Sequence, residues 1–513
     1  MQSQRPRNWI LAAPVAAVIA LLIVAVVRLG PGSARAKPAD PTVSATVGST
    51  PSGQPLPQGF VGVSFEYNWL HSYTGRNPKA VNPVLIALIH NLAPDKQTPI
   101  LRIGGESTDA TWWPIGKERT PPGVSYSLTP RWLRIVRALA GALKARMIMG
   151  VNLAADRPAL AAAEARAFLS GIGRRYIEAL EIGNEPDNYG IFPWYRTRDG
   201  RGRWVWSRPS NYSLSDFVAQ FSRWRAALPS APVTGPAFAE LTWLSGLEQF
   251  FSAEPGLALA TIHRYPLHGC LTDRSSAGYP SITNLLSDQA SSGLAQEVAP
   301  YVAVAHEHGV KFRIDEMNSA AVASCLGRRG VSGTFASALW VLDTLFNLAS
   351  AGVDGVNLHT LPTAAYELFT FKHPRRGWEA FVHPEYYGML LFAQAFPPGA
   401  QLLPASVSPT GPLKVWATRG SDGTTRVVLI NKDPSNGYEV QLQVPGWTAT
   451  AQVQWLEAPN VSSTDDVTLG GQTFGNETRT GTLAGTLHTD SVTPAGDTYT
   501  ITVPPASAAL VTQ

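Results

Sequence analysis

Residues 180–190 read LEIGNEPDNYG, an apolar run that ends in an amide, a carboxylate and a proline. A short apolar run bounded by glycine and proline is typical of a strand that is buried on both faces. The run therefore predicts a strand that delivers Asn184 and Glu185 to a site. Seven further runs have the same texture, and the eight together cover 59–67, 99–105, 145–153, 177–185, 231–238, 257–265, 310–318 and 353–360.

Helical patterns separate these runs. NPVLIALIHNL carries proline in its first turn, and later patterns follow Thr129 and Asp156, which we interpret as N-caps. Another begins Ser213-x-x-Asp216, close to a capping box. This alternation predicts the α/β class, with a (β/α)₈ TIM barrel over residues 59–390. A doubly wound open sheet is the alternative, but no G-x-G-x-x-G follows the first strand.

Residues 391–513 have a different texture. Alternating β stretches at 413–420, 425–432, 438–446 and 498–513 are broken by Gly, Asp, Ser and Pro. They predict a C-terminal all-β sandwich domain. Residues 41–58 contain TVSATVG, which reads as an N-terminal strand, and we expect this strand to join the sandwich.

Residues 1–40 form a targeting segment and linker. The apolar run 9–27 follows Arg5 and Arg7 and is about 19 residues long, enough to cross a bilayer. We favour an uncleaved membrane anchor, with a signal cleaved near SARAK (33–37) as the alternative. Either reading places the body of the protein outside the cytoplasm.

The charge of the body excludes nucleic acid as an expected partner. The chain has 41 basic and 37 acidic residues, a net charge of +4, and residues 1–40 contribute 5 − 1 = +4 of it. The remainder is therefore neutral, and the basic pI belongs to the targeting segment.

The chemistry is expected at the carboxyl ends of the strands, where barrel enzymes place their sites. Glu185 and Glu316 end the fourth and seventh runs. Glycosidic cleavage needs one carboxyl group that protonates the leaving oxygen and a second that is ionised. Configuration is retained if the two groups lie about 5–5.5 Å apart and inverted at about 6.5–9.5 Å. Arg313, Tyr265 or a barrel neighbour would hold Glu316 ionised.

Other strand-end residues fit a carbohydrate site without a cofactor. His263 is either a core histidine or a substrate ligand, and its place beside the other strand ends favours the ligand. The histidines show no H-x-x-x-H spacing, so no metal is expected. Several tryptophans lie after strands, and we favour sugar stacking for some of them, with plain packing as the alternative: Trp112, Trp113, Trp194, Trp204 and Trp206.

Four segments carry a resemblance to a known family. They are LRIGGESTDATWW (101–113), LEIGNEPD (180–187), IHRYPLHG (262–269) and RIDEMNSA (313–320). On these segments the chain resembles the clan A retaining glycoside hydrolases, and specifically glycoside hydrolase family 79, the β-glucuronidase and heparanase-like enzymes. The resemblance covers roughly residues 42–513, since family members also pair a barrel with a β-sandwich.

The resemblance implies roles for individual residues. Glu185 would be the acid/base and Glu316 the nucleophile, while Asn184 would bind the sugar 2-hydroxyl. Tyr265 would hydrogen-bond the nucleophile, and Glu66 would bind sugar hydroxyls.

One departure from the family pattern bears on the sugar. Family enzymes that bind a uronic-acid carboxylate tend to place a tyrosine shortly after the nucleophile and another after strand eight. Residues 317–331 contain no tyrosine, and this loop carries Cys325, Arg328 and Arg329 instead. Tyr366 is the candidate for the later position.

The two cysteines predict a disulfide. Cys270 lies seven residues past His263, and Cys325 lies nine past Glu316. Adjacent strands six and seven would bring these loops together at the rim of the cleft. A disulfide is expected in an exported protein, and two buried thiols are the alternative.

The leading function is an extracytoplasmic retaining β-glycosidase of the β-glucuronidase kind that acts on a carbohydrate substrate. A clan A glycosidase for neutral sugars, such as a xylosidase or arabinofuranosidase, is the alternative within enzymes. A non-catalytic, envelope-anchored carbohydrate-binding protein is the alternative outside enzymes.

Overall fold

The computed structural model describes residues 40–93, 97–197, 202–322, 325, 330–373 and 377–513. The apolar run 9–27, Arg328 and Arg329 lie outside the described residues. No helix within the described ranges is long and apolar enough to cross a membrane.

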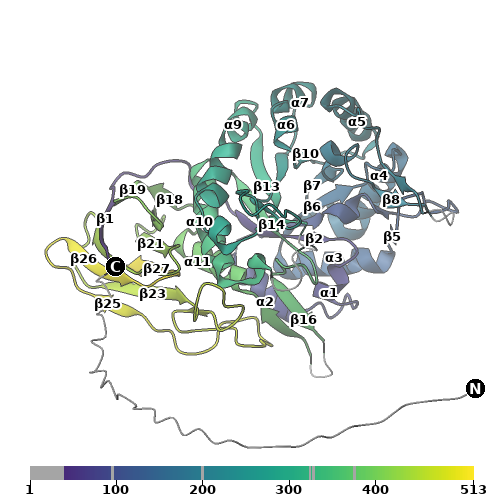
Figure 1. The fold of residues 1–513 in the computed structure, drawn as a ribbon. Coiled ribbons are helices and arrows are strands. Elements are labelled where there is room, and N and C mark those ends of the chain that lie inside the picture. The colour runs from purple at the N-terminus through teal and green to yellow at the C-terminus, as the bar shows by residue number, and fades with distance from the viewer. Residues whose placement is uncertain (1–39, 94–96, 198–201, 323–324, 326–329, 374–376) are drawn as a thin grey trace, which may run out of the picture. The chain divides into compact units, whose positions relative to one another are not determined.

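The described chain forms a closed barrel of parallel strands, which confirms the predicted TIM-barrel fold (Figure 1). The strands follow one another around the barrel as β10 (Val233–Phe238), β11 (Leu259–Arg264), β13 (Lys311–Met317), β15 (Gly355–Thr360), β2 (Val61–Glu66), β3 (Ile100–Gly104), β6 (Arg146–Val151) and β7 (Ile177–Ile182). All eight predicted runs are barrel strands. Their side chains are almost all buried, as expected for strands covered by helices outside and packed side chains inside.

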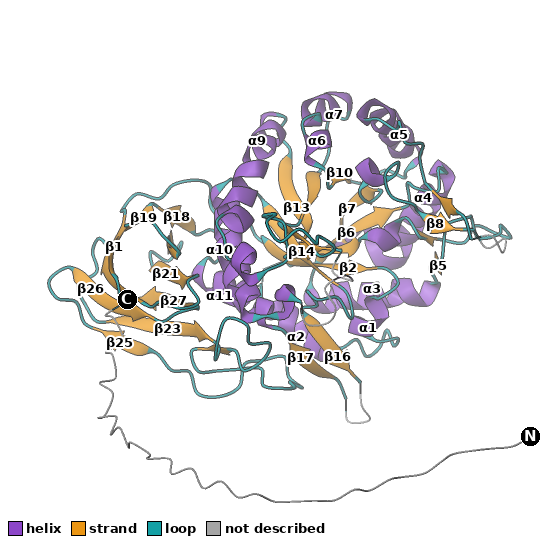
Figure 2. Cartoon of the chain, viewed as in Figure 1, coloured by secondary structure: helices purple, strands orange, loops and turns teal. Residues whose placement is uncertain are grey.

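Helices surround the barrel (Figure 2). They are α1 (Leu70–Thr74), α2 (Pro83–Asn91), α3 (Pro130–Leu143), α4 (Pro158–Ala167), α5 (Leu214–Ala227), α6 (Leu241–Leu244), α7 (Leu247–Ala253), α8 (Ile282–Leu285), α9 (Leu294–Glu307), α10 (Phe335–Ser350) and α11 (Pro384–Ala395). Thr129 caps α3, and Ser213 and Asp216 form the capping box of α5. The cap predicted at Asp156 is wrong. Arg157 precedes α4 without a side-chain cap bond, and Asp156 instead accepts a hydrogen bond from Gln220.

Four short two-stranded sheets lie in the described loops of the barrel. They are β4 (Thr111–Trp112) with β5 (Tyr126–Ser127), β8 (Tyr195–Arg196) with β9 (Trp204–Val205), β12 (Leu267–His268) with β14 (Ala320–Ala321), and β16 (Phe369–Lys372) with β17 (Glu379–Val382). The β4–β5, β8–β9 and β12–β14 pairs all follow the carboxyl ends of barrel strands.

Two sheets form the C-terminal sandwich. One has the order β19 (Ala405–Ser408), β1 (Thr42–Val47), β22 (Tyr438–Gln443), β26 (Thr498–Val503). The other has the order β18 (Gln401–Leu403), β20 (Leu413–Arg419), β21 (Thr425–Asn431), β27 (Ser507–Thr512), β23 (Ala451–Glu457), β24 (Thr468–Leu469), with β25 (Asp490–Val492) on β23. The early strand β1 pairs with β22, so the first described strand is part of the C-terminal sandwich, as predicted.

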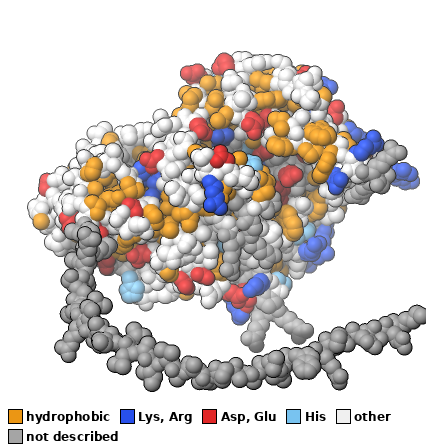
Figure 3. Space-filling view, in the orientation of Figure 1, with side chains coloured by type: hydrophobic (Ala, Val, Ile, Leu, Met, Phe, Trp, Pro, Cys, Tyr) orange, Lys and Arg blue, Asp and Glu red, His pale blue; other side chains and the backbone are white. Residues whose placement is uncertain are grey.

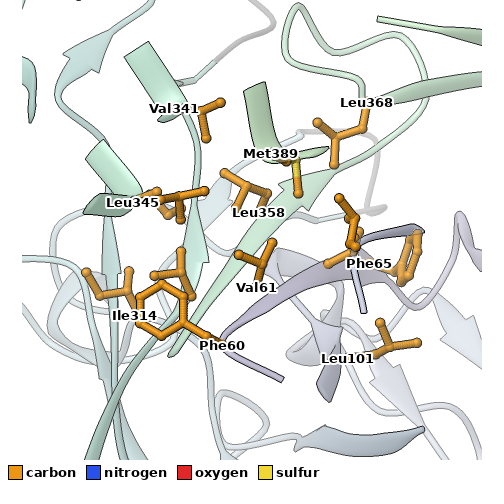
Figure 4. Close-up of a cluster of buried hydrophobic side chains, with 14 of the residues drawn as sticks. Phe60, Val61, Phe65, Leu101, Ile314, Val341, Leu345, Leu358, Leu368 and Met389 are labelled. Atoms are coloured by element: carbon orange, nitrogen blue, oxygen red, sulfur yellow. The ribbon is translucent and has the colours of Figure 1, made fainter. Parts of the chain in front are cut away.

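Two apolar cores support these parts. Figure 4 shows the outer face of the barrel wall, where Val61 and Leu358 meet Leu345 of α10 and Met389 of α11. The sandwich has its own core, to which β1 contributes every second residue. A buried ion pair joins the barrel and the sandwich. Nζ of Lys432, which directly follows β21, lies 2.7 Å from Oδ2 of Asp343 in α10.

Candidate active site

Glu185 lies three residues past the end of β7, and its position is fixed by the backbone. It has φ 48° and ψ 55°, a left-handed conformation that is uncommon for a residue with a side chain. Its N–H donates to the carbonyl of Ala237 at 3.0 Å. Asp187 accepts from the N–H groups of Ala239 and Glu240 at 2.9 and 2.5 Å, which ties this turn to the end of β10.

Glu316 lies on β13 beside an irregularity in the barrel. Against β11, Ile262 pairs with Ile314 but His263 pairs with Glu316, so Asp315 is an extra residue. Such a bulge interrupts the strict alternation of side chains between the two faces of a strand. Glu316 is therefore able to face the same centre as its neighbour Asp315, and both contact the guanidinium of Arg102.

The structure places the two predicted acids, Glu185 and Glu316, close together. One carboxylate oxygen of Glu185, one of Glu316 and a ring nitrogen of His263 all lie within 4.8 Å of one another. This close approach of the nearest oxygens agrees with the short carboxyl separation of about 5–5.5 Å found in retaining glycosidases.

Glu316 is held ionised. Arg102 Nη1 donates to its Oε2 at 2.6 Å, Tyr265 donates to its Oε1 at 2.9 Å, and His359 Nδ1 lies 3.8 Å from Oε2. Burial alone would raise the pKa of Glu316, but the neighbouring His359, His263 and Arg102 outweigh it and hold the pKa well below its usual range. Burial likewise opposes a charge on His359, but Glu316 and Glu66 outweigh it and raise the pKa of that imidazole.

Glu185 has a different environment. Its side chain is 26 % exposed, against 9 % for Glu316, so water reaches it more readily. His263 Nδ1 lies 2.9 Å from one oxygen, and Asn188 donates to the other at 3.0 Å. Arg102 Nη2, which only donates, lies 3.1 Å from His263 Nε2. His263 Nε2 is thus an acceptor, and Nδ1 carries the proton that is donated to Glu185.

Arg102 is the central residue that the sequence did not identify. It is fully buried on β3. Besides Glu316 it contacts Glu181 at 2.7 Å and Asp315 at 3.1 Å through Nε, and it donates to the side-chain oxygen of Asn184 at 2.9 Å. One guanidinium therefore fixes residues from three other strand ends, which suits its five donors in a rigid fork.

Glu181 and Asp315 form a buried acid pair beneath the site. Burial and the neighbouring Glu181 raise the pKa of Asp315 well above its usual range. Burial acts in the same direction on Glu181, but Arg102 outweighs it and lowers that pKa. We conclude that the pair holds one proton and one negative charge, which balances Arg102.

Two sets of side chains have donor atoms close enough to hold a metal ion: Glu181, His263 and Asp315, and Glu185, His263 and Glu316. The guanidinium of Arg102 bonds to members of both sets. It supplies the positive charge that a metal would bring, so these residues do not fit a metal centre.

The remaining predicted substrate residues surround the same centre. Asn184 is nearly buried, and Arg102 binds its oxygen, which orients its amide nitrogen as the donor left for a ligand. Tyr366 is buried with its ring centre 6.1 Å from those of Tyr265 and His359. Glu66 accepts from the N–H groups of Glu106 and Ser107, so it anchors the loop after β3 and also borders the site.

Two of the alternatives that the sequence left open do not hold. Arg313 does not contact Glu316. It donates to Asn357 and to the carbonyl of Gly59, within the barrel. Trp112 is buried in β4 and donates to Ser127, so it packs rather than stacks on a ligand. No sequence signal separated it from Trp194, which borders a cleft.

The structure joins Cys270 and Cys325 in a disulfide with a Cα–Cα distance of 5.2 Å. Leu267–His268 of β12 pairs with Ala320–Ala321 of β14 just before them. The loops after strands β11 and β13 are therefore fastened together at the rim, as the spacing of the cysteines predicted.

A cleft of about 720 Å³ opens beside Glu66, at the border of the acid centre. Its lining comes from the loops after β2, β3, β7 and β15: Glu66, Asn68, Trp69, Glu106, Ser107, Ala110, 120–125, 194–197 and Leu361. Glu66 borders both the cleft and the acid centre. Over the face in Figure 3, acidic and basic side chains are interspersed, in agreement with the neutral body of the chain.

Comparison with known proteins supports the resemblance. Residues 415–510 match the family described as the glycosyl hydrolase family 79 C-terminal beta domain. The C-terminal domain belongs to family 79. The match confirms for this domain the family that the barrel motifs suggested. A search of curated proteins finds no match.

Solved structures share the fold of the chain. A 4-O-α-L-rhamnosyl-β-D-glucuronidase from Fusarium oxysporum 12S is 21 % identical, with a TM-score of 0.70, and covers 92 % of this chain and 100 % of its own. A GH51 arabinofuranosidase from Xanthomonas axonopodis pv. citri is 16 % identical with a TM-score of 0.63, and it covers 92 % and 100 %. A family 44 xyloglucanase from Paenibacillus polymyxa is 10 % identical with a TM-score of 0.57, and it covers 92 % and 99 %. All three are glycosidases, and they share the architecture of this chain.

Proposed function

We propose that this protein is a retaining β-glycoside hydrolase of the β-glucuronidase kind. The observation that carries the proposal is the close approach of the Glu185 and Glu316 carboxylates, within 4.8 Å. The family 79 C-terminal domain and the glucuronidase among the structural neighbours support the same sugar class.

The first step is attack by Glu316. Its lowered pKa keeps the carboxylate ionised, and the bonds from Arg102 and Tyr265 aim it at the anomeric carbon. Glu185 gives its proton to the leaving oxygen as the glycosidic bond breaks. A covalent glycosyl ester of Glu316 and a free alcohol result.

The second step is hydrolysis of that ester. Glu185, now ionised, takes a proton from a water molecule that attacks the anomeric carbon. The ester bond to Glu316 breaks, and the sugar leaves with its original configuration. The amide nitrogen of Asn184 is placed to donate to a hydroxyl of the sugar, a bond that strengthens as charge develops.

A panel of aryl β-glycosides tests the function. We expect hydrolysis of the aryl β-glucuronide, and Glu316→Gln should lower kcat by several orders of magnitude. Glu307→Gln, an exposed carboxylate at the end of α9, is the matched control and should act as wild type. Cleavage of only xylosides or arabinofuranosides would favour the neutral-sugar alternative. Undiminished sugar binding without any turnover would favour the non-catalytic binder.

The role of each acid has its own test. A mechanism-based fluorinated aryl glycoside should leave a sugar ester on Glu316, which peptide mass spectrometry identifies. Glu185→Gln should slow substrates with poor leaving groups far more than activated ones, because only the former need protonation. A label on any other residue would refute the assignment.

We also propose that the protein acts outside the cytoplasm, anchored or released by residues 1–40. The apolar run 9–27 and a disulfide at the rim of the site both suit an exported protein. Fractionation of cells that express the full chain tests this, and activity confined to the cytosol would refute it.

A further inference from the structure

An exposed apolar patch lies on the long loop after β7, outside the cleft. Eight large apolar side chains of the described residues are strongly exposed, and four of them fall within residues 191–206. We call these four the hairpin patch, and their exposed fractions are 60 % for Ile191, 59 % for Phe192, 52 % for Trp204 and 45 % for Trp206. None of the four borders the cleft. Apolar side chains gathered on a surface in this way mark a site of contact with a protein or a membrane.

The members of the hairpin patch are joined to one another. Trp206 Nε1 donates to the carbonyl of Ile191 at 3.1 Å, which ties the loop to the β8–β9 hairpin. Trp204 and Trp206 are two residues apart along one strand segment, and alternate residues of a strand face the same side. Arg196 pairs with Trp204 across the hairpin, and its guanidinium lies 4.8 Å from the centre of the indole ring. This contact holds the indole at the surface, so little conformational freedom is lost when a partner binds.

Positive charge is concentrated on the same segment. The body of the chain is neutral, but residues 191–208 contain one aspartate and five arginines, a net charge of 5 − 1 = +4. Of these arginines, Arg196 and Arg203 are exposed in the described part of the hairpin. In Figure 3 basic side chains gather at the right-hand edge, where Figure 1 places β8. Exposed tryptophan flanked by arginine suits the headgroup level of a bilayer with anionic lipids, where the indole is amphipathic and the guanidinium binds phosphate.

The proposed membrane anchor would keep this surface near a bilayer. Twelve residues, 28–39, separate the apolar run 9–27 from the first described residue, Asp40. A chain of that length reaches at most about 43 Å. A body on so short a tether meets the bilayer at a high effective concentration, so a patch of modest affinity is sufficient. This step rests on the proposed location, whereas the hairpin patch belongs to the described body.

We propose that the hairpin patch binds the surface of a bilayer that contains anionic phospholipids. Its four apolar side chains enter the headgroup region, and the neighbouring arginines bind lipid phosphates. An acidic polysaccharide would pair with the arginines but would leave the apolar side chains in water, so the composition of the patch favours the lipid. Trp194 and Tyr195 of the same hairpin line the cleft, and binding therefore brings the mouth of the active site close to the membrane.

Sedimentation with lipid vesicles tests the inference on residues 40–513. These residues form a compact unit with the complete barrel and sandwich, and they lack the proposed anchor. We expect them to bind vesicles of phosphatidylcholine mixed with phosphatidylglycerol more tightly than vesicles of phosphatidylcholine alone, and added salt should weaken the binding. Trp204→Ala should lower the affinity about tenfold through the lost apolar contact, and Arg203→Gln should lower it about fivefold through the lost charge.

Matched controls come from other surfaces of the body. Leu487→Ala removes an apolar side chain that is 53 % exposed on the sandwich, and Arg137→Gln removes an exposed charge of α3. Both should bind vesicles as the wild type does, and melting temperatures establish that each variant is folded. One measurement needs no variant: lipids brominated in their acyl chains should quench the tryptophan fluorescence of the wild-type body.

The inference is overturned if the body leaves the mixed vesicles unbound, or if Trp204→Ala and Leu487→Ala weaken binding equally. Binding to an acidic polysaccharide without binding to vesicles would also overturn it. So would a dimer that forms through the hairpin patch while vesicles stay unbound. The proposed glycosidase function and location are judged separately, because vesicle binding by residues 40–513 requires neither hydrolysis of a glycoside nor the anchor.

Discussion

The acid pair beneath the active centre allows a sharp test of how its charge is arranged. Glu181 and Asp315 share one proton, so each single variant, Glu181→Gln or Asp315→Asn, still leaves one carboxylate beside Arg102. We therefore expect each to cost little at neutral pH. The double variant removes both carboxylates and strands the Nε side of a fully buried cation, which costs about 3–5 kcal/mol. Most of that cost should appear as coupling and not as the sum of the single effects.

The direction in which pH changes the stability of the protein follows from these pKa shifts. The pKa of Asp315 is raised on folding, so above about pH 4 the native protein holds a proton that the unfolded chain has released. The wild type thus loses about 1.4 kcal/mol of stability per pH unit from that point up to the folded pKa. Asp315→Asn removes this loss, so its stability relative to wild type should grow as the pH rises above about 4. The lowered pKa of Glu181 acts oppositely, because its contribution is lost as the pH falls.

Urea denaturation of the four proteins, at several pH values from 4 to 7, measures both effects. Glu307→Gln again serves as a control with an exposed carboxylate. An additive double variant would refute the shared proton. So would a stability difference between Asp315→Asn and wild type that stays flat across this range of pH.

Three further outcomes follow from the same structure. His359→Gln removes a positive charge beside Glu316, so the pKa of Glu316 should rise and the acidic limb of kcat/KM should move up by about 1–2 pH units; an unmoved limb contradicts this. Lys432→Met leaves a buried carboxylate of α10 unpaired and should destabilise the chain by about 3–5 kcal/mol in calorimetry, with kcat preserved; an unchanged melting temperature contradicts it. Reduction of the Cys270–Cys325 disulfide opens a loop of 55 residues and should cost about 4 kcal/mol, while two alkylatable thiols in the unreduced protein would contradict the cross-link.

The barrel could be predicted because its strands leave a strong local signal. Each is a short apolar run, buried on both faces, and bounded by turn residues or helix caps. A helix cap depends on residues that are close in sequence, so the capping box at Ser213 could be predicted. The cap predicted at Asp156 is wrong because this residue has a φ of 51° and lies in a turn before the helix. The sequence pattern does not reveal that the chain bends there.

Arg102 could not be assigned from sequence, although its segment was recognised. A lone arginine in an apolar strand has no fixed partner until the barrel closes. Its partners Glu181 and Glu316 come from strands 79 and 214 residues away. Arg313 has the same appearance and lies nearer to Glu316 in sequence, but its guanidinium turns toward Asn357. Closure and stagger of the strands decide which arginine reaches the acids, and neither is a local property.

Glu185 and Glu316 lie close together because the backbone departs from regular geometry at two places. Glu185 occupies a left-handed conformation beyond its strand, and the bulge at Asp315 allows Glu316 to face the same centre as its neighbour. Regular alternation would send consecutive residues to opposite faces, and only one carboxylate of the pair 315–316 would reach Arg102. Irregular backbone costs stability, so it persists where the surrounding contacts hold it. Here those contacts are the bonds of Asp187 to β10 and the guanidinium of Arg102, which is why the residues that position the acids matter as much as the acids themselves.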